Sequence, residues 1–78
     1  MKEFETNILK ALVAVDRPEA MVNATKSADP EVAYETIFAA VMEMENKNYI
    51  KLVYCQAPTV INVQLTLVGR DAYLSQNK

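Results

Sequence analysis

The N-terminal segment carries the apolar spacing of an amphipathic helix. Between residues 3 and 16 the apolar positions recur every three or four residues, at Phe4, Ile8, Ala11, Leu12 and Val15. Leu9 and Val13 add a second apolar line beside this face. The segment is therefore predicted to be a helix that is apolar around an unusually large part of its circumference. Deep burial explains such a helix, and so does contact with a partner.

Two later segments begin with the same helix-start signal, an aspartate followed closely by proline and glutamate. The signal occurs at Asp16, Pro18 and Glu19, and again at Asp29, Pro30 and Glu31. Aspartate caps free backbone amides, proline is tolerated in the first turn, and early glutamates favour the positive end of the helix dipole. The pattern predicts a short helix from near Pro18 and a longer helix from near Pro30 to about Lys47. The predicted buried sides are Met21, Ala24 and Ala28 in the short helix, and Ala33, Ile37, Ala40, Val41 and Met44 in the longer one.

The apolar pattern then changes to a period of two, which indicates β-strands. Ile50, Leu52 and Tyr54 alternate with Lys51, Val53 and Cys55, and Ile61, Val63 and Leu65 alternate with Val60, Asn62 and Gln64. Pro58 lies between the two runs and cannot donate a hydrogen bond to a neighbouring strand. The pattern predicts one antiparallel hairpin of residues 50–55 and 60–65. Ile61, Val63 and Leu65 are expected to face the core, and Asn62 and Gln64 to face outward.

The C-terminal segment contains the single glycine of the chain, Gly69. Leu65 is predicted to end the second strand, and the apolar residues after it follow a helical spacing. Thr66 is expected to cap this helix through its hydroxyl, which places Gly69 in the first turn. Glycine in a helix costs up to about 1 kcal/mol. We therefore expect another backbone, from the first helix or a partner subunit, to approach Gly69 closely; the alternative is a plain break between strand and helix at this glycine.

Two short patterns join these predicted elements. In MENKNYI (residues 44–50) the long helix ends in an apolar residue, polar residues, Asn48, an aromatic residue and an isoleucine; LTLVGRDAYL (residues 65–74) leads from the hairpin into the last helix. With these patterns the chain resembles the winged helix-turn-helix family of small bacterial and phage transcription regulators, in which glycine is common at the position of Asn48. The expected fold is α+β. It is a single winged-helix domain over residues 1–78, with three helices, a two-stranded antiparallel wing and a short C-terminal helix.

Composition narrows the ways in which so small a chain is stabilised. A chain of 78 residues buries roughly 60% of the surface that its unfolded form exposes, so its core is marginal. One cysteine, Cys55, and no histidine exclude an internal disulfide and argue against a zinc site. With 51% apolar residues, the remaining means of stabilisation is association, and we expect a homodimer.

The same composition gives no support to catalytic chemistry. The chain has no histidine base, no glycine-rich phosphate loop and no cysteine–histidine or serine–histidine pair. The expectation is a non-enzymatic protein without a cofactor or metal. The sequence has no apolar run of membrane-spanning length and no signal-peptide pattern, and it has a free cysteine, so a cytoplasmic location is predicted.

The resemblance implies that early outward residues of the long helix contact DNA bases while basic side chains contact phosphates. Those outward residues make a poor DNA-binding surface, because residues 29–45 contain five acids (Asp29, Glu31, Glu35, Glu43 and Glu45) and neither lysine nor arginine. The net charge of −2 and the pI of about 5.0 likewise disfavour general polyanion binding. The possible DNA contacts are Lys26, Glu31, Tyr34, Glu35, Lys47, Lys51, Gln56, Thr59 and Asn62.

A second surface of the long helix indicates protein contact. Tyr34, Phe38 and Met42 are spaced four residues apart, so they stack on a face separate from the predicted core side. Aromatic residues and methionine are enriched at protein interfaces, and Leu9 and Val13 are further interface candidates. Two hypotheses remain. The favoured one is a winged-helix regulatory protein that acts mainly through protein contacts of its long helix in transcription control; the alternative is a dimeric DNA-binding regulator.

Overall fold

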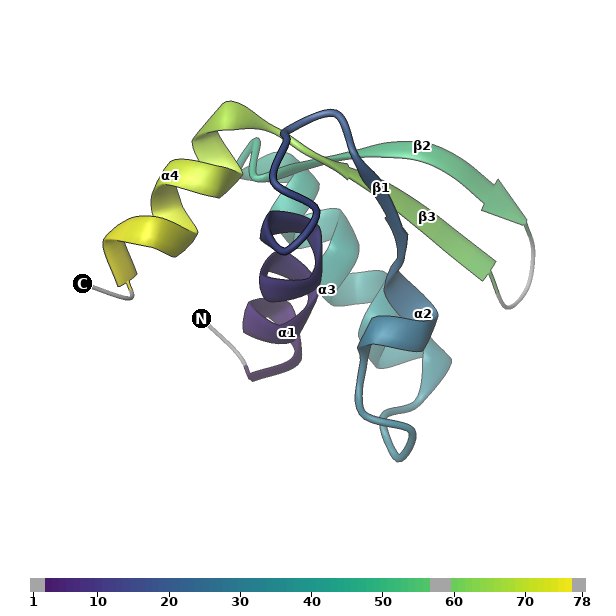
Figure 1. Cartoon of the computed structure of the whole chain (residues 1–78). Coiled ribbons are helices and arrows are strands. Elements are labelled where there is room, and N and C mark those ends of the chain that lie inside the picture. Colours follow the sequence, from purple (N-terminus) through teal and green to yellow (C-terminus); the bar gives the residue numbers. More distant parts are fainter. Residues whose placement is uncertain (1–2, 57–59, 77–78) are drawn as a thin grey trace.

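Four helices and three strands follow one another in the computed structural model, which describes residues 3–56 and 60–76 (Figure 1). The elements in chain order are α1 (Glu3–Val13), β1 (Met21–Asn23), α2 (Ala24–Ser27), α3 (Tyr34–Asn46), β2 (Ile50–Gln56), β3 (Val60–Leu65) and α4 (Leu67–Gln76). The fold is α+β, as predicted. None of the helices in the described ranges has the length and apolarity that crossing a membrane requires.

The three strands form one antiparallel sheet in the order β1-β3-β2. The predicted hairpin of β2 and β3 is confirmed, with Ile50 opposite Leu65 and Leu52 opposite Val63. A register shift between Leu52 and Tyr54 leaves Val53 without an opposite residue. The pairing that the predicted alternation implies is therefore interrupted at Val53, where a bulge inserts one residue and shifts the register of the following positions by one.

The core lies between the sheet and the helices α1 and α3. Ile61, Val63 and Leu65 are buried, which confirms the predicted inward face of β3. Figure 1 shows α1 below the sheet in the middle of the molecule, where it packs against α2, α3 and α4. The buried apolar side chains of the two long helices are Phe4, Ile8, Leu9 and Leu12 from α1 and Ile37, Ala40, Val41 and Met44 from α3. Burial from several sides accounts for the apolar circumference of α1.

The short helix predicted from near Pro18 is wrong in its position. Asp16 has a φ of 61°, and the segment that follows it forms turns rather than a helix. Met21–Asn23 is the strand β1, which pairs with the edge of β3, with Val22 opposite Val63. The helix α2 begins only at Ala24, where the Asn23 side chain accepts a hydrogen bond from the Lys26 amide at 3.1 Å. Pairing with β3 satisfies the backbone groups that would have formed internal hydrogen bonds in a helix from Pro18. Met21 was predicted to lie on the buried side of that helix, and in the strand it is exposed.

The long helix begins at Tyr34, four residues later than predicted. Asp29 does not cap it; its carboxylate accepts a hydrogen bond from the Glu31 amide at 2.9 Å within a local turn. Ala33 is the N-cap residue and is exposed, so it does not belong to the buried side to which the sequence pattern assigned it. The other predicted core positions of α3 are buried, and the helix ends at Asn46, one residue before Lys47.

The turn after α3 closes with a left-handed residue, Asn48, whose φ is 64°. The Asn48 amide donates to the Glu45 carbonyl at 2.9 Å, and the Tyr49 amide donates to the Met44 carbonyl at 3.0 Å. This is the pattern of a Schellman C-cap, for which asparagine is the usual substitute when glycine is absent. The turn places the backbone of Tyr49 against the start of α4.

The start of α4 explains the position of Gly69. The Gly69 amide donates to the Thr66 hydroxyl at 3.0 Å, which confirms that Thr66 caps the helix. A β-carbon on Gly69 would lie 2.7 Å from the carbonyl carbon of Tyr49 and 2.9 Å from its α-carbon. The expected close approach of another backbone is confirmed, but its source was predicted wrongly, because it is the turn between α3 and β2. The alternative of a helix break at Gly69 is wrong, since α4 continues through this residue.

Replacing Thr66 with valine should lower the free energy of unfolding by about 2 kcal/mol. The Thr66 hydroxyl caps Gly69 and also lies within hydrogen-bonding distance of the Asn48 and Tyr49 carbonyl oxygens, so it ties α4 to the turn after α3. Valine keeps the shape and removes these hydrogen bonds. Urea denaturation measures the change, and Thr66→Ser, which keeps the hydroxyl, is the matched control. Equal stability of the valine and serine variants would contradict a role for the hydroxyl.

Candidate interaction surface on helix α3

The side of α3 turned away from the core carries two exposed large apolar side chains. Phe38 is 38% exposed and Met42 is 36% exposed, and they lie one helical turn apart. Tyr34 is partly buried and contacts Phe38, with 6.1 Å between the ring centroids and 30° between the ring planes. We call the surface formed by Tyr34, Glu35, Phe38 and Met42 the α3 face. Its separation from the buried side of the helix agrees with the sequence pattern.

One acidic residue, Glu35, lies on this face, and another, Glu31, lies in the loop before α3. Glu31 and Glu35 are exposed, and neither forms an ion pair with any of the described residues. Glu43 pairs with Lys47, with 3.3 Å between the Glu43 Oε1 and Lys47 Nζ atoms. Glu45 instead accepts a hydrogen bond from the Leu52 amide at 3.1 Å, which joins α3 to β2. Lys47 follows the C-terminal end of α3, about 18 Å along the helix from Glu35, so it does not offset the charge of Glu31 and Glu35.

The residues predicted as possible DNA contacts are spread over several elements. Lys26 lies on α2 and Lys51 on β2, and both are exposed. Asn62 is half-buried on the central strand, opposite Asn23 on one side and Tyr54 on the other. Gln56 ends β2 opposite Val60, and Thr59 lies outside the described residues. The three lysines thus come from the short helix, the end of the long helix and the first strand of the hairpin.

The two predicted interface residues of α1 differ in burial. Leu9 is fully buried in the core, so its assignment to an interface is not supported. Val13 is partly buried against the core, as Tyr34 is, and its interface role stays a prediction. The predicted interface residues that are exposed, Phe38 and Met42, lie on α3.

Other exposed apolar side chains were not identified from the sequence as surface candidates. Leu67 is 67% exposed, and Val68 and Leu74 are also exposed, all on α4. Only Gly69 of this helix is buried. The signal available in the sequence was the glycine itself, which marks the closest contact of this helix; Tyr73, on the same helix, is partly buried against the core.

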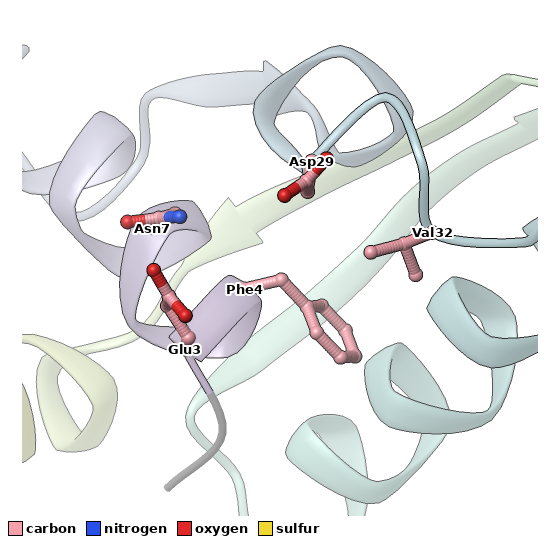
Figure 2. Close-up of a pocket in the computed structure, with 5 residues that line it drawn as sticks. All are labelled: Glu3, Phe4, Asn7, Asp29 and Val32. Atoms are coloured by element: carbon pink, nitrogen blue, oxygen red, sulfur yellow. The ribbon is translucent and has the colours of Figure 1, made fainter.

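A small cavity lies between the start of α1 and the loop before α3. Figure 2 shows Glu3, Phe4 and Asn7 from the helix and Asp29 and Val32 from the loop around it. The cavity holds about 120 Å³, well below the roughly 300 Å³ at which small-molecule sites begin. Within the described ranges, no three side chains of metal-binding type gather at one place. The cavity therefore indicates no particular ligand chemistry.

The α3 face is thus the surface on which a single element brings exposed aromatic, thioether and acidic side chains together. The cavity lacks the volume of a ligand site, and the possible DNA contacts are spread over separate elements. Comparisons with protein-family models, with curated proteins and with solved structures find no match to this chain, so what indicates its function is the geometry and charge of its own residues.

Proposed function

We propose that this chain is a small non-enzymatic regulatory protein of winged-helix topology that acts mainly through protein contacts of α3 in transcription control. The order of elements supports the topology, because a short helix α2, a long helix α3 and the β2–β3 hairpin follow one another. The connection to transcription rests on the resemblance of MENKNYI and LTLVGRDAYL to winged-helix regulators.

The observation that carries the proposal is the character of the α3 face. Phe38 and Met42 expose apolar surface on the same helix face as the Glu35 carboxylate, and Glu31 is exposed in the loop before this helix. Aromatic and methionine side chains are the residue types enriched in protein interfaces. The carboxylates would repel the phosphates of DNA, and lysine and arginine, which supply the electrostatic part of DNA affinity, do not occur between residues 29 and 45. The face is therefore better suited to a protein than to a nucleic acid.

The proposal predicts that a photoreactive residue at position 38 cross-links to a protein partner in cells that naturally contain this chain. A benzophenone side chain in place of Phe38 keeps an aromatic group at the centre of the α3 face, and mass spectrometry identifies what it captures. The matched control carries the same group in place of Leu67, which is 67% exposed on α4. We expect a component of a transcription complex at position 38 that is absent at position 67.

The competing hypothesis, a dimeric DNA-binding regulator, is favoured by the exposed positions of Lys26 and Lys51. It predicts nanomolar, sequence-selective binding of duplex DNA by the unmodified protein, and a cross-link from position 38 to DNA. Our proposal expects dissociation constants of about 1 μM or weaker at physiological salt. Replacing Glu31 and Glu35 together with lysine should then strengthen DNA binding and steepen its salt dependence. A cross-link to a second copy of the chain would show that α3 is the homodimer interface.

A further inference from the structure

We infer that the partner of the α3 face presents a basic amphipathic helix, with a short apolar stripe flanked by lysine or arginine. This inference rests on the proposed function, because it takes α3 as a protein-binding surface and specifies what that surface binds. Three features carry it: the spacing of the apolar side chains, the position of the acidic ones, and the lack of an ion pair between Glu31 or Glu35 and any described residue.

The apolar part of the face has the dimensions of a helix-on-helix contact. Phe38 and Met42 are four residues apart, and Tyr34 supports the Phe38 ring from the preceding turn. Three positions spaced by four residues extend over about 12 Å of helix, since each residue rises about 1.5 Å. An amphipathic helix presents apolar residues over the same length when it places them at i, i+3 or i+4, and i+7.

The acidic residues define the charge of the occupant. Glu35 lies three residues before Phe38 and seven before Met42, so its carboxylate borders the same stripe. Glu31 is exposed in the loop that leads into this end of the helix. Neither carboxylate forms an ion pair with a described residue, and Lys47 lies at the other end of α3, where it pairs with Glu43. The face thus combines apolar surface with uncompensated negative charge, which lysine or arginine of a partner complements.

The same charges disfavour a second copy of the chain on this face. In a two-fold symmetric contact, the same patch occurs on both subunits and faces itself. Such a contact would bring two surfaces of the same negative charge together, and like charges at an interface are repulsive. A basic segment of a different protein has no such penalty.

The test uses the full chain and two synthetic helical peptides. Both carry leucine at i, i+4 and i+7; one has lysine at its flanking positions, and the other has glutamate at the same positions. We expect the basic peptide to bind at least about tenfold more tightly than the acidic one at low salt, and its affinity to fall as salt is added. Fluorescence anisotropy of labelled peptides measures both affinities.

Variants locate the peptide on the α3 face. Phe38→Ala should weaken the basic peptide by about tenfold or more, as truncation of a central aromatic side chain commonly does. Met42→Ala is a second apolar truncation, with circular dichroism confirming that each variant is folded. Glu35→Lys should remove most of the preference for the basic peptide. The controls are Leu67→Ala, an exposed apolar truncation on α4, and Glu19→Lys, a charge reversal in the exposed turn before β1; neither should change the affinity by more than about twofold.

Equal binding of the two peptides, or loss of binding in the Leu67 and Glu19 controls as large as in the α3 variants, would overturn the inference. So would self-association that Phe38→Ala abolishes, because the occupant would then be a second copy. Duplex DNA binding that Phe38→Ala abolishes would overturn it in favour of a nucleic acid. If position 38 cross-links to a protein while neither peptide binds, the basic partner is excluded and the proposed function stands. If both experiments fail, the proposed function fails as well.

Discussion

Gly69→Ala should lower the free energy of unfolding by about 3 kcal/mol, the upper part of the range for overpacking. Alanine is normally the better helix residue by about 1 kcal/mol. Here its β-carbon would lie 2.7 Å from the carbonyl carbon and 2.9 Å from the α-carbon of Tyr49, which are backbone atoms in a turn. That turn is held by the Schellman hydrogen bonds after α3, so relieving the clash requires moving α4 or the start of β2.

The midpoint of thermal unfolding should fall accordingly, by roughly 12–24 °C at 4–8 °C per kcal/mol for a domain of this size. Calorimetry or circular dichroism measures the shift. Val68→Ala is the control, because Val68 is the exposed neighbour of Gly69 on the same helix and its truncation should change stability by no more than about 0.5 kcal/mol. An unchanged or raised midpoint for Gly69→Ala would show that the turn yields easily and that the glycine is not required by this contact.

Leu9→Ala should lower the free energy of unfolding by about 3 kcal/mol, within the usual range of 2–5 kcal/mol for a buried leucine. Leu9 is fully buried among the side chains that α1 places against the sheet and the other helices. Truncation removes buried apolar surface and leaves a cavity that the neighbouring side chains fill only in part. For a domain of 78 residues, whose total stability is on the order of 4–12 kcal/mol, this is a large fraction.

Leu67→Ala is the matched control for Leu9→Ala, since it makes the same chemical change at a position that is 67% exposed. Its effect on urea denaturation should stay within about 0.5–1 kcal/mol, because little buried surface is lost. Comparable effects of the two substitutions would contradict the placement of Leu9 in the core. They would instead agree with the original prediction that Leu9 belongs to an interface.

The sequence alone was sufficient for elements whose signal is periodic over several turns or residues. The spacing of Phe4, Ile8 and Leu12 predicted α1, and the alternation around Ile61, Val63 and Leu65 predicted the buried side of β3. The buried side of α3 was likewise predicted apart from Ala33. These patterns are reliable because the apolar face of a regular helix or strand must pack against the rest of the protein, whichever segment lies there. For the same reason the helical spacing of Phe38 and Met42 was sufficient to place them on a different face from the buried side of α3.

Where a local sequence signal was compatible with two structures, contacts with the rest of the molecule decided between them. An aspartate followed by proline and glutamate favours a helix start, yet Asp29 forms a turn within the loop and Asp16 takes a left-handed conformation. The strand β1 contains three residues, too few for a period to be recognised. It exists because β3 has an edge with backbone groups to satisfy. The bulge at Val53 depends in the same way on the register with β3.

Gly69 shows the division between sequence and tertiary structure most directly. The sequence by itself predicted a close backbone contact at Gly69, with a break between strand and helix as the alternative, because glycine lowers the helix propensity of a capped first turn. Only the tertiary structure decided that the contact is Tyr49, since that depends on where the left-handed Asn48 directs the chain after α3. The same division applies to the surface. The sequence determined the spacing of Tyr34, Phe38 and Met42 and the acidic residues near them in the chain. Packing decided that Leu9 is buried while Phe38 and Met42 remain exposed, because burial depends on contacts between segments far apart in the chain.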